Sequence, residues 1–380
     1  MNAYNHQTSP LNTPTAETAK ILVIRFMAIG DVVLSSVLCN SLKKTFPKAQ
    51  VDYLVHEVSA GLFENHPYID NVISLSKEER KNPFKYWRKI RQITSAEYDL
   101  VVDAQSTNKS EFIAMLARKR AICIGRAKKG RGFFYTNKVD AKAGGGNKIT
   151  ERLRLLEPLV AIGFDVKRDT DFVLNTAMTL KNEMRVSMEA AGVDFKRPVF
   201  LMSVTAKEKN KRWELSKMQA WAQYAIDAYN AQLVLFSGSD EEQNEVETFY
   251  SALGEHPDIY PRINSDSLSK LTALMSHCDL FFGNEGGPRH LAQACGLPSA
   301  VVLSPRAKKP EWLASQSALH QGVEWDDVSE LTKSEQAQVN ESLKVDSDQY
   351  WSLYQNIRPE HAIEVLDSVA KAAGIPIRSV

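Results

Sequence analysis

The sequence predicts an α/β protein in which two doubly wound domains follow one another along the chain. Short apolar runs of strand length, such as Lys20–Met27, alternate with segments of helical periodicity, which is typical of parallel sheets covered by helices on both faces. The alternation stops in the polar segment 165–179 and then begins again. With 380 residues, there is room for two hydrophobic cores. We therefore expect an N-terminal domain over residues 20–175, a C-terminal domain over residues 176–350 and a helical tail over residues 351–380.

The first domain is expected to begin with a buried strand and a helix. Val32–Phe46 has apolar residues at helical spacing and ends before Pro47, where a helix cannot continue. Later apolar runs and helical patterns repeat this order. The expected strands are Lys20–Met27, Val51–Val55, Val72–Leu75, Leu100–Asp103 and Ala121–Gly125, and the expected helices are Val32–Phe46, Phe84–Ile93, Lys109–Arg118 and Ile149–Ile162.

The second domain repeats the pattern of the first. The expected strands are Val199–Val204, Leu233–Phe236, Leu280–Phe282 and Ser299–Leu303. The expected helices are Val186–Ala191, Ser216–Tyr229, Glu241–Leu253, Leu268–Ser276 and Arg289–Cys295, with Trp351–Ile357 and Pro359–Ala373 in the tail. Gly296 and Pro298 end the helix Arg289–Cys295, since both residues commonly follow a helix.

Composition excludes several classes of protein. The net charge of +1 implies no general affinity for polyanions, and no nucleic-acid-binding motif is present, so no nucleic-acid partner is expected. The cysteines form no C-x-x-C pair and are expected to be buried thiols: Cys39, Cys123, Cys278 and Cys295. No apolar run reaches the roughly 18 residues of a membrane span. Residues 1–19 are polar and lack an apolar core, so we expect a disordered lead-in and no signal peptide.

The turn Gly283–Pro288 connects a buried strand to a helix. Such a turn lies at the carboxyl end of a parallel sheet, where open α/β sheets bind ligands. The helix start offers free N–H groups and a positive dipole end to an anion, and Gly286 and Gly287 allow the backbone to approach that anion closely. The alternative is an ordinary tight turn of a doubly wound domain. The spacing differs from G-x-G-x-x-G, which disfavours a dinucleotide site.

Asp31 follows the first expected strand and lies at the start of the first expected helix. In isolation, this position is also typical of a helix N-cap, a role that aspartate often fills. The motif I-R-F-M-A-I-G-D-V-V-L (residues 24–34) and the motif N-E-G-G-P-R-H-L-A-Q-A (residues 284–294) lie about 250 residues apart in matching structural contexts, which makes the pair more specific than either motif alone.

These two motifs resemble those of the glycosyltransferase family that contains the ADP-heptose:lipopolysaccharide heptosyltransferases (family 9). The family's late pattern is roughly Asp-Ser/Thr-Gly-Pro-x-His-Leu-Ala-Ala-Ala. Glu285 stands where the family usually has Asp, and Gly286 where it has Ser or Thr. The resemblance covers residues 20–303 and implies the GT-B fold, with two Rossmann-like domains facing a central cleft and a tail that crosses back to the N-terminal domain.

The resemblance also implies a reaction. The family transfers a heptose, with inversion, from ADP-L-glycero-β-D-manno-heptose to the inner core of lipopolysaccharide. Asp31 would be the catalytic base. The donor-binding residues implied by the resemblance are Gly30, Thr205, Lys211, Glu242, Glu285, Gly286, Gly287 and His290. Thr205 and Lys211 would hold the diphosphate, and Glu242 or its neighbour Glu241 the ribose.

Alternatives remain for several of these residues. Glu241 and Glu242 are also favourable in the first turn of any helix. His290 either orients the phosphate-binding turn or packs as a core histidine. Lys211 lies in a lysine-rich segment that could simply be solvated.

A basic run is the candidate site for an acidic glycolipid acceptor. It contains Arg126, Lys128, Lys129 and Arg131, with glycines between them. Arginine makes bidentate contacts to phosphates and carboxylates, although a charge run can also be a solvated surface. The cations between Arg80 and Arg91 flank Phe84, Tyr86 and Trp87, a mixture that suits an anionic membrane face.

The expected protein is thus cytoplasmic and peripherally bound to the inner membrane. No cofactor is expected, and no His/Cys cluster in the sequence demands a metal, so the reaction is expected to be metal-independent. The rival hypotheses are a GT-B transferase with another sugar or acceptor, a nucleotide-dependent oxidoreductase, disfavoured by the missing glycine fingerprint, and a non-catalytic protein that binds nucleotide sugars or glycans.

Overall fold

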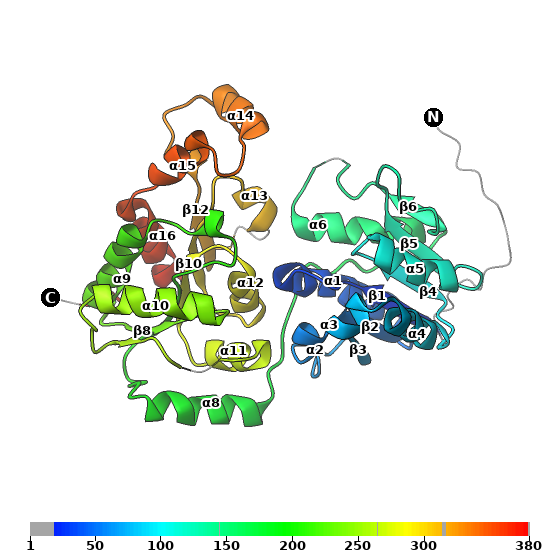
Figure 1. Cartoon of the computed structure of the whole chain (residues 1–380), viewed down its shortest axis with the longest axis horizontal. Coiled ribbons are helices and arrows are strands. Elements are labelled where there is room, and N and C mark those ends of the chain that lie inside the picture. The colour runs from blue at the N-terminus through cyan, green and yellow to red at the C-terminus, as the bar shows by residue number, and fades with distance from the viewer. Residues whose placement is uncertain (1–18, 144, 264, 314–316, 379–380) are drawn as a thin grey trace. The chain divides into compact units, whose positions relative to one another are not determined.

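The chain forms two compact α/β units. The computed structural model describes residues 19–143, 145–263, 265–313 and 317–378. The first unit ends at Phe172 and the second begins at Val173 (Figure 1). The expected lead-in over residues 1–19 lies outside the described residues except for Ala19, which is buried.

The first unit contains a six-stranded parallel sheet. Its strands are β1 (Lys20–Ile24), β2 (Gln50–His56), β3 (Asn71–Leu75), β4 (Leu100–Asp103), β5 (Ile122–Arg126) and β6 (Asn137–Val139). Its helices are α1 (Ile29–Thr45), α2 (Glu57–Ala60), α3 (Lys77–Lys81), α4 (Pro83–Thr94), α5 (Asn108–Ala117), α6 (Lys148–Leu153) and α7 (Glu157–Ala161), with a 3-10 turn η1 (Arg154–Leu156).

The strand order of this sheet reverses in its middle. The order is β3-β2-β1-β4-β5-β6, with Ile21 opposite Val51 on one side and Leu100 on the other. The chain winds outward from β1 in one direction and then outward from β4 in the other. The loops after β1 and β4 therefore flank a topological switch point, which is the usual ligand position in open α/β sheets.

The second unit repeats this architecture. Its strands are β7 (Val199–Ser203), β8 (Gln232–Leu235), β9 (Ile259–Tyr260), β10 (Leu280–Asn284), β11 (Ser299–Val302) and β12 (His320–Val323), in the order β12-β11-β10-β7-β8-β9. Its helices are α8 (Met178–Ala190), α9 (Leu215–Tyr229), α10 (Asp240–Ala252), α11 (Leu268–Met275), α12 (Gly287–Ala294), α13 (Lys309–Trp312), α14 (Lys333–Ser342), α15 (Asp348–Gln355) and α16 (Pro359–Ala372), with 3-10 turns η2 (Lys209–Lys211) and η3 (Trp325–Asp327). The switch point here lies between β7 and β10.

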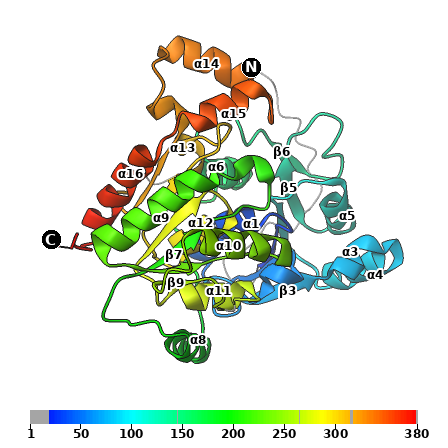
Figure 2. The ribbon, with the colours of Figure 1, turned by 60° about the vertical axis from the view of Figure 1, so that its left-hand side comes forward.

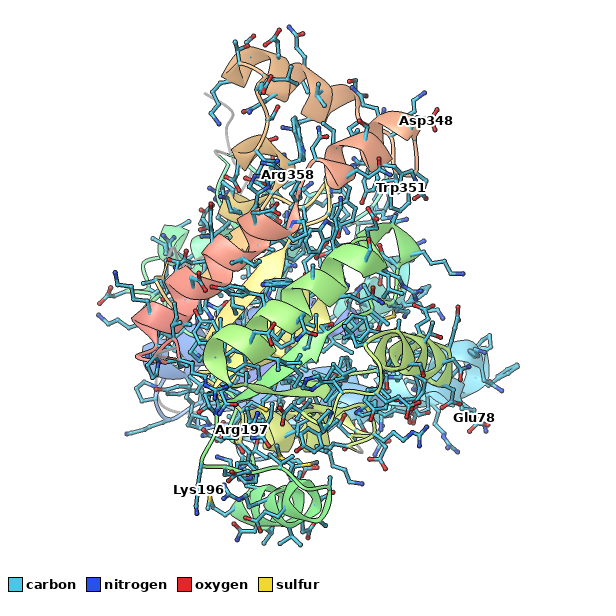
Figure 3. All side chains as sticks on the ribbon, turned by 90° about the vertical axis from the view of Figure 1, so that its left-hand side faces the viewer. Glu78, Lys196, Arg197, Asp348, Trp351 and Arg358 are labelled. Carbon is cyan, nitrogen blue, oxygen red and sulfur yellow. The ribbon has the colours of Figure 1, made fainter. Side chains whose placement is uncertain are left out.

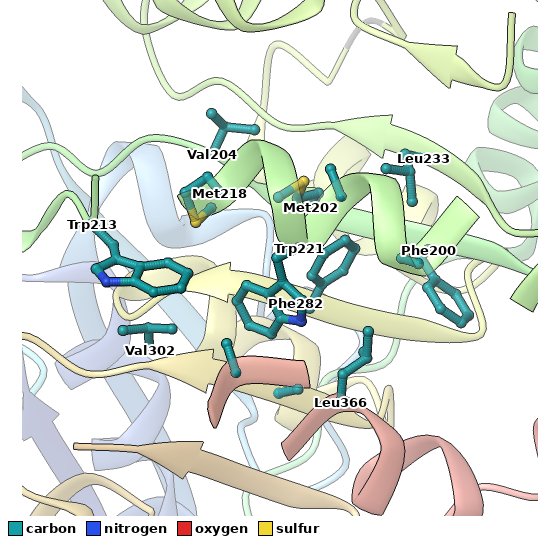
Figure 4. Close-up of a cluster of buried hydrophobic side chains, with 14 of the residues drawn as sticks. Phe200, Met202, Val204, Trp213, Met218, Trp221, Leu233, Phe282, Val302 and Leu366 are labelled. Atoms are coloured by element: carbon teal, nitrogen blue, oxygen red, sulfur yellow. The ribbon is translucent and has the colours of Figure 1, made fainter. Parts of the chain in front are cut away.

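Aromatic side chains fill the core on one face of the second sheet. Trp221 of α9 is buried and meets Phe282 of β10 edge to face, with ring centroids 5.0 Å apart (Figure 4). Trp213 packs edge-on against Trp221 at 6.1 Å, and its indole N–H donates to the carbonyl of Ile357. This cluster ties the segment before α9 to the sheet, so the chain that leaves β7 has a defined path.

The structure confirms the predicted α/β class and most elements, and it differs at some boundaries. Helix α1 begins at Ile29, three residues before the expected start at Val32, which places Asp31 inside the helix. The helix expected over Ile149–Ile162 is divided into α6, η1 and α7, with Pro158 at the start of α7. Strands β6, β9 and β12 were not predicted, because each is short and carries no long apolar run.

The described part of the tail expected over residues 351–380 belongs to the second unit. Its expected crossing to the first domain stays a prediction. Helix α16 lies against β11, β12 and α9, and Figure 3 shows it beginning beside Arg358. Leu366 and Val369 on its inner face are fully buried in the core of the second unit. This apolar face holds the tail where it lies.

Candidate active site

The predicted site residues gather at the two switch points. In the first unit, the predicted residue Asp31 follows β1, and Gln105, which was not predicted, follows β4. In the second unit, Thr205 follows β7 and Glu285 follows β10. Both places are carboxyl ends of parallel strands, where helix starts and loops leave the sheet. We describe each set within its own unit.

Two arginines hold the Asp31 carboxylate. One oxygen lies 2.5 Å from Nη2 of Arg25, and the other lies 2.6 Å from Nη2 of Arg152. The side chain of Asp31 is 22% exposed, whereas those of Arg25 and Arg152 are 9% and 3% exposed. The cluster therefore presents its anion to solvent and keeps its cations inside.

Asp31 is not a helix cap. The N-cap of α1 is Ala28, which makes no side-chain cap bond, and Asp31 lies in the first turn. There its charge also interacts favourably with the positive end of the helix dipole. The alternative role as an N-cap is therefore wrong, because the helix begins earlier than its apolar pattern indicated. Gly30 precedes Asp31 and is buried.

Further bonds fix both arginines. Arg25 Nη1 donates to the carbonyl of Ala104, and Arg152 Nε donates to the hydroxyl of Ser35. Burial lowers the pKa of Arg25, and the neighbouring Asp31 opposes that effect. Arg25 and Arg152 were not among the site residues predicted from the sequence. Arg25 was detectable as the one cation inside the apolar part of its strand, but nothing in the sequence connects Arg152 to Asp31.

The four residues of the predicted basic acceptor site have different surroundings. Arg126 pairs with Glu151 at 2.8 Å, and burial lowers its pKa. The Lys128 ammonium donates to the carbonyl of Ser106 at 2.8 Å, and burial lowers its pKa also. Lys129 and Arg131 are exposed.

A basic pocket lies between α3, α4 and the start of α5. Its volume is about 460 Å³, and its lining includes Phe26, which follows β1, and Gln105, which follows β4. The cations that line it are Arg80, Lys81, Lys109 and Arg131, and none of the described lining residues is acidic. Arg131 is thus the one member of the predicted acceptor set that faces this pocket, and the other three cations come from segments that the prediction had not assigned to the acceptor.

In the second unit, Thr205 and Glu242 contact each other. The Thr205 hydroxyl donates to Oε2 of Glu242 at 2.9 Å, and the same oxygen accepts from the backbone N–H of Gly238 at 2.9 Å. Both side chains are buried. Glu241 points outward instead and lies 3.8 Å from Lys209. Of the two glutamates, only Glu242 therefore lies beside the predicted phosphate-binding residue.

Lys211 and Glu285 also come together. The Lys211 ammonium lies 3.8 Å from Oε1 of Glu285, an oxygen that also accepts from the hydroxyl of Ser304 at 2.8 Å. Ser304 follows β11 and was not predicted. Three neighbouring strand ends thus contribute one hydroxyl, one ammonium and one carboxylate to the same place.

Asn284 joins the turns that carry these residues. Its amide nitrogen donates to the carbonyl of Val204 at 2.7 Å, and its oxygen accepts from the backbone N–H of Trp213 at 2.9 Å. The side chain is buried. Gly283, which precedes Asn284 in β10, has φ of 129°, and a Cβ at this position would lie 2.3 Å from the carbonyl oxygen of Ser203. Only glycine allows β7 and β10 to approach this closely.

Helix α12 begins directly beyond Glu285. Gly286 is its N-cap, with φ of 157° and no side-chain cap bond. Gly287 is the first helical residue and Pro288 the second. Gly286 has no side chain that could accept a hydrogen bond from the first N–H groups of α12. These groups are therefore available to an anion.

His290 is buried and neutral. Its Nδ1 lies 3.0 Å from Nη1 of Arg289, so this nitrogen accepts, and the ring proton is on Nε2. Burial lowers the pKa of His290 well below its usual value, and the charges of Arg289 and Lys211 lower it further. Its ring also lies 5.7 Å from that of Trp312. The histidine can therefore act as a hydrogen-bond donor but not as a cation.

Among the residues that the structure describes, no cluster of three or more His, Cys, Asp or Glu side chains has the arrangement of a metal site. No helix within the same residues combines the length and the apolar character that a membrane span requires.

Two doubly wound domains, each with candidate residues at its switch point, have the architecture of the GT-B class. Comparison with known proteins makes the assignment specific. The model of glycosyltransferase family 9 (heptosyltransferase) matches residues 86–308, which is more than half of the chain. The chain belongs to this family and is a glycosyltransferase.

Individual relatives agree with this assignment. The chain is 23% identical over 291 residues to lipopolysaccharide heptosyltransferase 1 of Campylobacter coli, which covers 75% of the chain and 83% of the relative. The structure of Escherichia coli ADP-heptose lps heptosyltransferase II is similar, with a TM-score of 0.72 and 18% identity over 93% of this chain and 99% of the other. E. coli heptosyltransferase WaaC with ADP-2-deoxy-2-fluoro heptose has a TM-score of 0.60 and 16% identity over 80% and 93% of the two chains.

Proposed function

We propose that this glycosyltransferase transfers a heptose from ADP-heptose to the inner core of lipopolysaccharide, with inversion and without a metal ion. Membership of the heptosyltransferase family supports the reaction class. The names of the relatives support a lipopolysaccharide acceptor and an ADP-heptose donor. The arrangement of residues in each unit supports particular roles for them.

Asp31 is the proposed general base. An ionised carboxylate has about four lone-pair positions, and Arg25 and Arg152 each engage one of its oxygens. The remaining positions can accept the proton of the acceptor hydroxyl. As that proton moves to Asp31, the hydroxyl oxygen forms a bond to the anomeric carbon, and the bond from this carbon to the phosphate oxygen breaks. A single displacement of this kind inverts the anomeric centre.

The second unit holds the donor in this proposal. The leaving ADP gains negative charge, which the Lys211 ammonium and the free N–H groups of α12 would stabilise. Thr205 would contact the diphosphate and Glu242 the ribose. His290, as a neutral donor, would hydrogen-bond a phosphate oxygen or orient the turn around Gly286 and Gly287. Glu285, already held by Ser304, would accept from a sugar hydroxyl.

The basic pocket of the first unit is the proposed acceptor site. Arg80, Lys81, Lys109 and Arg131 would meet the phosphates and carboxylates of an acidic glycolipid, for which arginine and lysine are suitable partners. The acceptor-binding role of the other predicted residues, Arg126, Lys128 and Lys129, stays a prediction. Such an acceptor would place the protein at the cytoplasmic face of the inner membrane, as a peripheral protein.

The observation that carries this proposal is the Asp31 carboxylate, partly exposed at a switch point and held by two buried arginines. The test is incubation of the purified protein with ADP-heptose and a heptose-deficient lipopolysaccharide core. We expect stoichiometric ADP release and a core heavier by one heptose in mass spectrometry. If the core gains no mass while ADP-heptose binds, the protein acts on a different acceptor or only binds the donor.

A further inference from the structure

Helix α4 has one face in the core and the opposite face in solvent. Tyr86, Ile90 and Ile93 are buried. The outward positions follow the spacing i, i+3, i+4 and i+7, which places them on one side of a helix. They are Phe84, Trp87, Arg88 and Arg91, all of them exposed, and we refer to these four residues as the outer face of α4.

The aromatic residues of this face are unusual for an exposed surface. Phe84 is 87% exposed and Trp87 is 42% exposed. Their backbone is well fixed, because the Asn82 side chain caps the helix through the N–H groups of Phe84 and Lys85. A large apolar ring held in water on a rigid helix gains free energy when another apolar phase covers it.

The charges around these rings that have no ion-pair partner among the described residues are all positive. Lys85 and Lys89 form ion pairs with Glu78 and Glu79 of the neighbouring helix α3, so those lysines are neutralised locally. By contrast, no carboxylate in the described part of the chain pairs with Arg88, Arg91 or Lys81. Figure 2 shows α3 and α4 side by side at an edge of the first unit. The outer face of α4 therefore carries two exposed aromatic rings with unpaired cations beside them.

We propose that the outer face of α4 docks on the anionic lipid surface of a membrane. Aromatic rings enter the boundary between headgroups and acyl chains, and arginines pair with anionic headgroups. An anionic lipid surface complements the exposed rings and the unpaired cations together. The inference rests on the proposed function at one point: the proposed glycolipid acceptor lies in a membrane, and this membrane is the expected docking partner.

The same helix connects this surface to the basic pocket. Tyr86, on the inner side of α4, lines the pocket together with Arg80 and Lys81. Its hydroxyl donates to the carbonyl of Lys109, which fixes the helix to the start of α5. Docking through the outer face would thus keep the pocket within one helix diameter, about 10–12 Å, of the lipid headgroups, where the sugar core of a glycolipid begins.

The test compares variants of the full chain in co-sedimentation with vesicles. One variant carries Phe84→Ser and Trp87→Ser, and another carries Arg88→Gln and Arg91→Gln. The matched control carries Val186→Ser and Lys333→Gln, at exposed positions of the second unit. The neutral vesicles contain phosphatidylcholine alone, and the anionic vesicles contain a mixture of phosphatidylcholine and phosphatidylglycerol. All variants are also assayed on a core oligosaccharide from which the lipid has been removed.

We expect wild type and control to bind the anionic vesicles and not the neutral ones. Each α4 variant should bind the anionic vesicles on the order of tenfold more weakly or worse, because each lost arginine or ring removes a substantial part of the attraction. Turnover of the lipid-free core should stay unchanged in every variant. That result separates docking from catalysis.

The proposal is overturned if both α4 variants bind anionic vesicles like wild type, or if wild type binds neither kind of vesicle. Loss of dimerisation in the α4 variants, without loss of vesicle binding, would make this face an interface between copies of the chain. If wild type binds vesicles through α4 but never modifies the lipid-free core, docking stands and the proposed function fails.

Discussion

At the scale of single residues, the Asp31 cluster combines a structural ion network with a candidate catalytic group. Two largely buried guanidinium groups share one carboxylate, and removal of one partner from a buried pair commonly costs about 3–5 kcal/mol. Selection for stability alone would not require the anion to be 22% exposed. The exposed edge of the carboxylate is what a substrate hydroxyl could reach.

Replacement of Asp31 by Asn should nearly abolish turnover. The amide has the same shape but cannot accept a proton at neutral pH, so we expect kcat to fall by about 10²–10⁴ while ADP still binds to the second unit. The measurements are steady-state kinetics and calorimetry with ADP. Because the change leaves Arg25 and Arg152 without their anion, thermal melting must show that the variant is folded at the assay temperature. Turnover within a few-fold of wild type would leave Asp31 a purely structural role.

Replacement of Arg152 by Met should lower kcat and leave the affinity for ADP unchanged. Arg152 Nη2 holds one oxygen of the Asp31 carboxylate at 2.6 Å, and without this bond the carboxylate is no longer fixed where it can accept the proton of the acceptor hydroxyl. We expect kcat to fall by about 10²-fold, because small displacements of a reacting group are costly. Steady-state kinetics and calorimetry with ADP measure the two effects.

Arg152→Lys keeps a positive charge beside Asp31 and should restore much of the wild-type kcat. Arg262→Met serves as the control, because Arg262 pairs with Glu247 at the surface. Equal kcat in Arg152→Lys and Arg152→Met would mean that Arg152 matters for packing alone.

The sequence predicted individual residues unevenly. Asp31, Lys211 and Glu285 were assigned from the family resemblance, and each of them follows a strand that was recognisable from its apolar run. Arg152 and Ser304 were missed because their partners are distant in sequence, and only the folded sheet brings them together. Arg126 was predicted from charge alone, and charge does not reveal that Glu151 lies 2.8 Å away.

At the scale of elements, the connection between β7 and β10 organises the second unit's site. Asn284 bridges the turn after β7 and the segment that leads to α9, and Gly283 permits the close approach of the two strands. The Gly-rich turn itself was predicted. The bridge was not, because a buried asparagine at the end of a strand has no distinctive pattern in a single sequence.

Replacement of Asn284 by Ala should loosen this connection. It removes the partners of the Val204 carbonyl and the Trp213 N–H, and each buried unsatisfied group costs about 1–3 kcal/mol. We expect a lower melting temperature and at least a roughly tenfold weaker affinity for ADP, since Lys211 lies on the segment that loses its anchor. Calorimetry with ADP measures the effect. Asn244→Ala, at an exposed position of α10, is the control, and equal ADP affinity in the two variants would contradict the role of the bridge.

At the scale of the whole molecule, each unit has its own candidate ligand. Pattern and periodicity were sufficient to predict both parallel sheets, because buried parallel strands have continuous apolar runs. The pattern could not show that α16 packs on the second unit, since an amphipathic helix reveals that it packs but not against which sheet. The same limit applies to the pocket, whose four cations come from three separate segments of the chain.

The reaction should not depend on a divalent cation. In the proposed mechanism, Lys211 and the start of α12 neutralise the leaving diphosphate, a role that metal ions fill in other transferases. Activity should therefore survive dialysis against EDTA with less than about a twofold change in kcat. Loss of activity with EDTA that Mg²⁺ or Mn²⁺ restores would require a different arrangement for the leaving group.

The last prediction assigns the acceptor to the first unit. A variant with Arg80→Gln, Lys81→Gln and Arg131→Gln loses three of the four cations that line the basic pocket. Charge–charge attraction to an acidic acceptor weakens accordingly, so we expect the acceptor KM to rise about tenfold at low ionic strength and its salt dependence to diminish. The affinity for ADP should stay unchanged.

A second variant distinguishes the pocket from the rest of the predicted basic run. It carries Lys128→Gln and Lys129→Gln, which leave the pocket lining intact. If the acceptor binds in the pocket, this variant keeps an acceptor KM close to that of wild type, and only the pocket variant responds to salt as predicted. If the Lys128 and Lys129 variant alone raises the acceptor KM, the acceptor binds along the basic run, and the pocket has no part in its recognition.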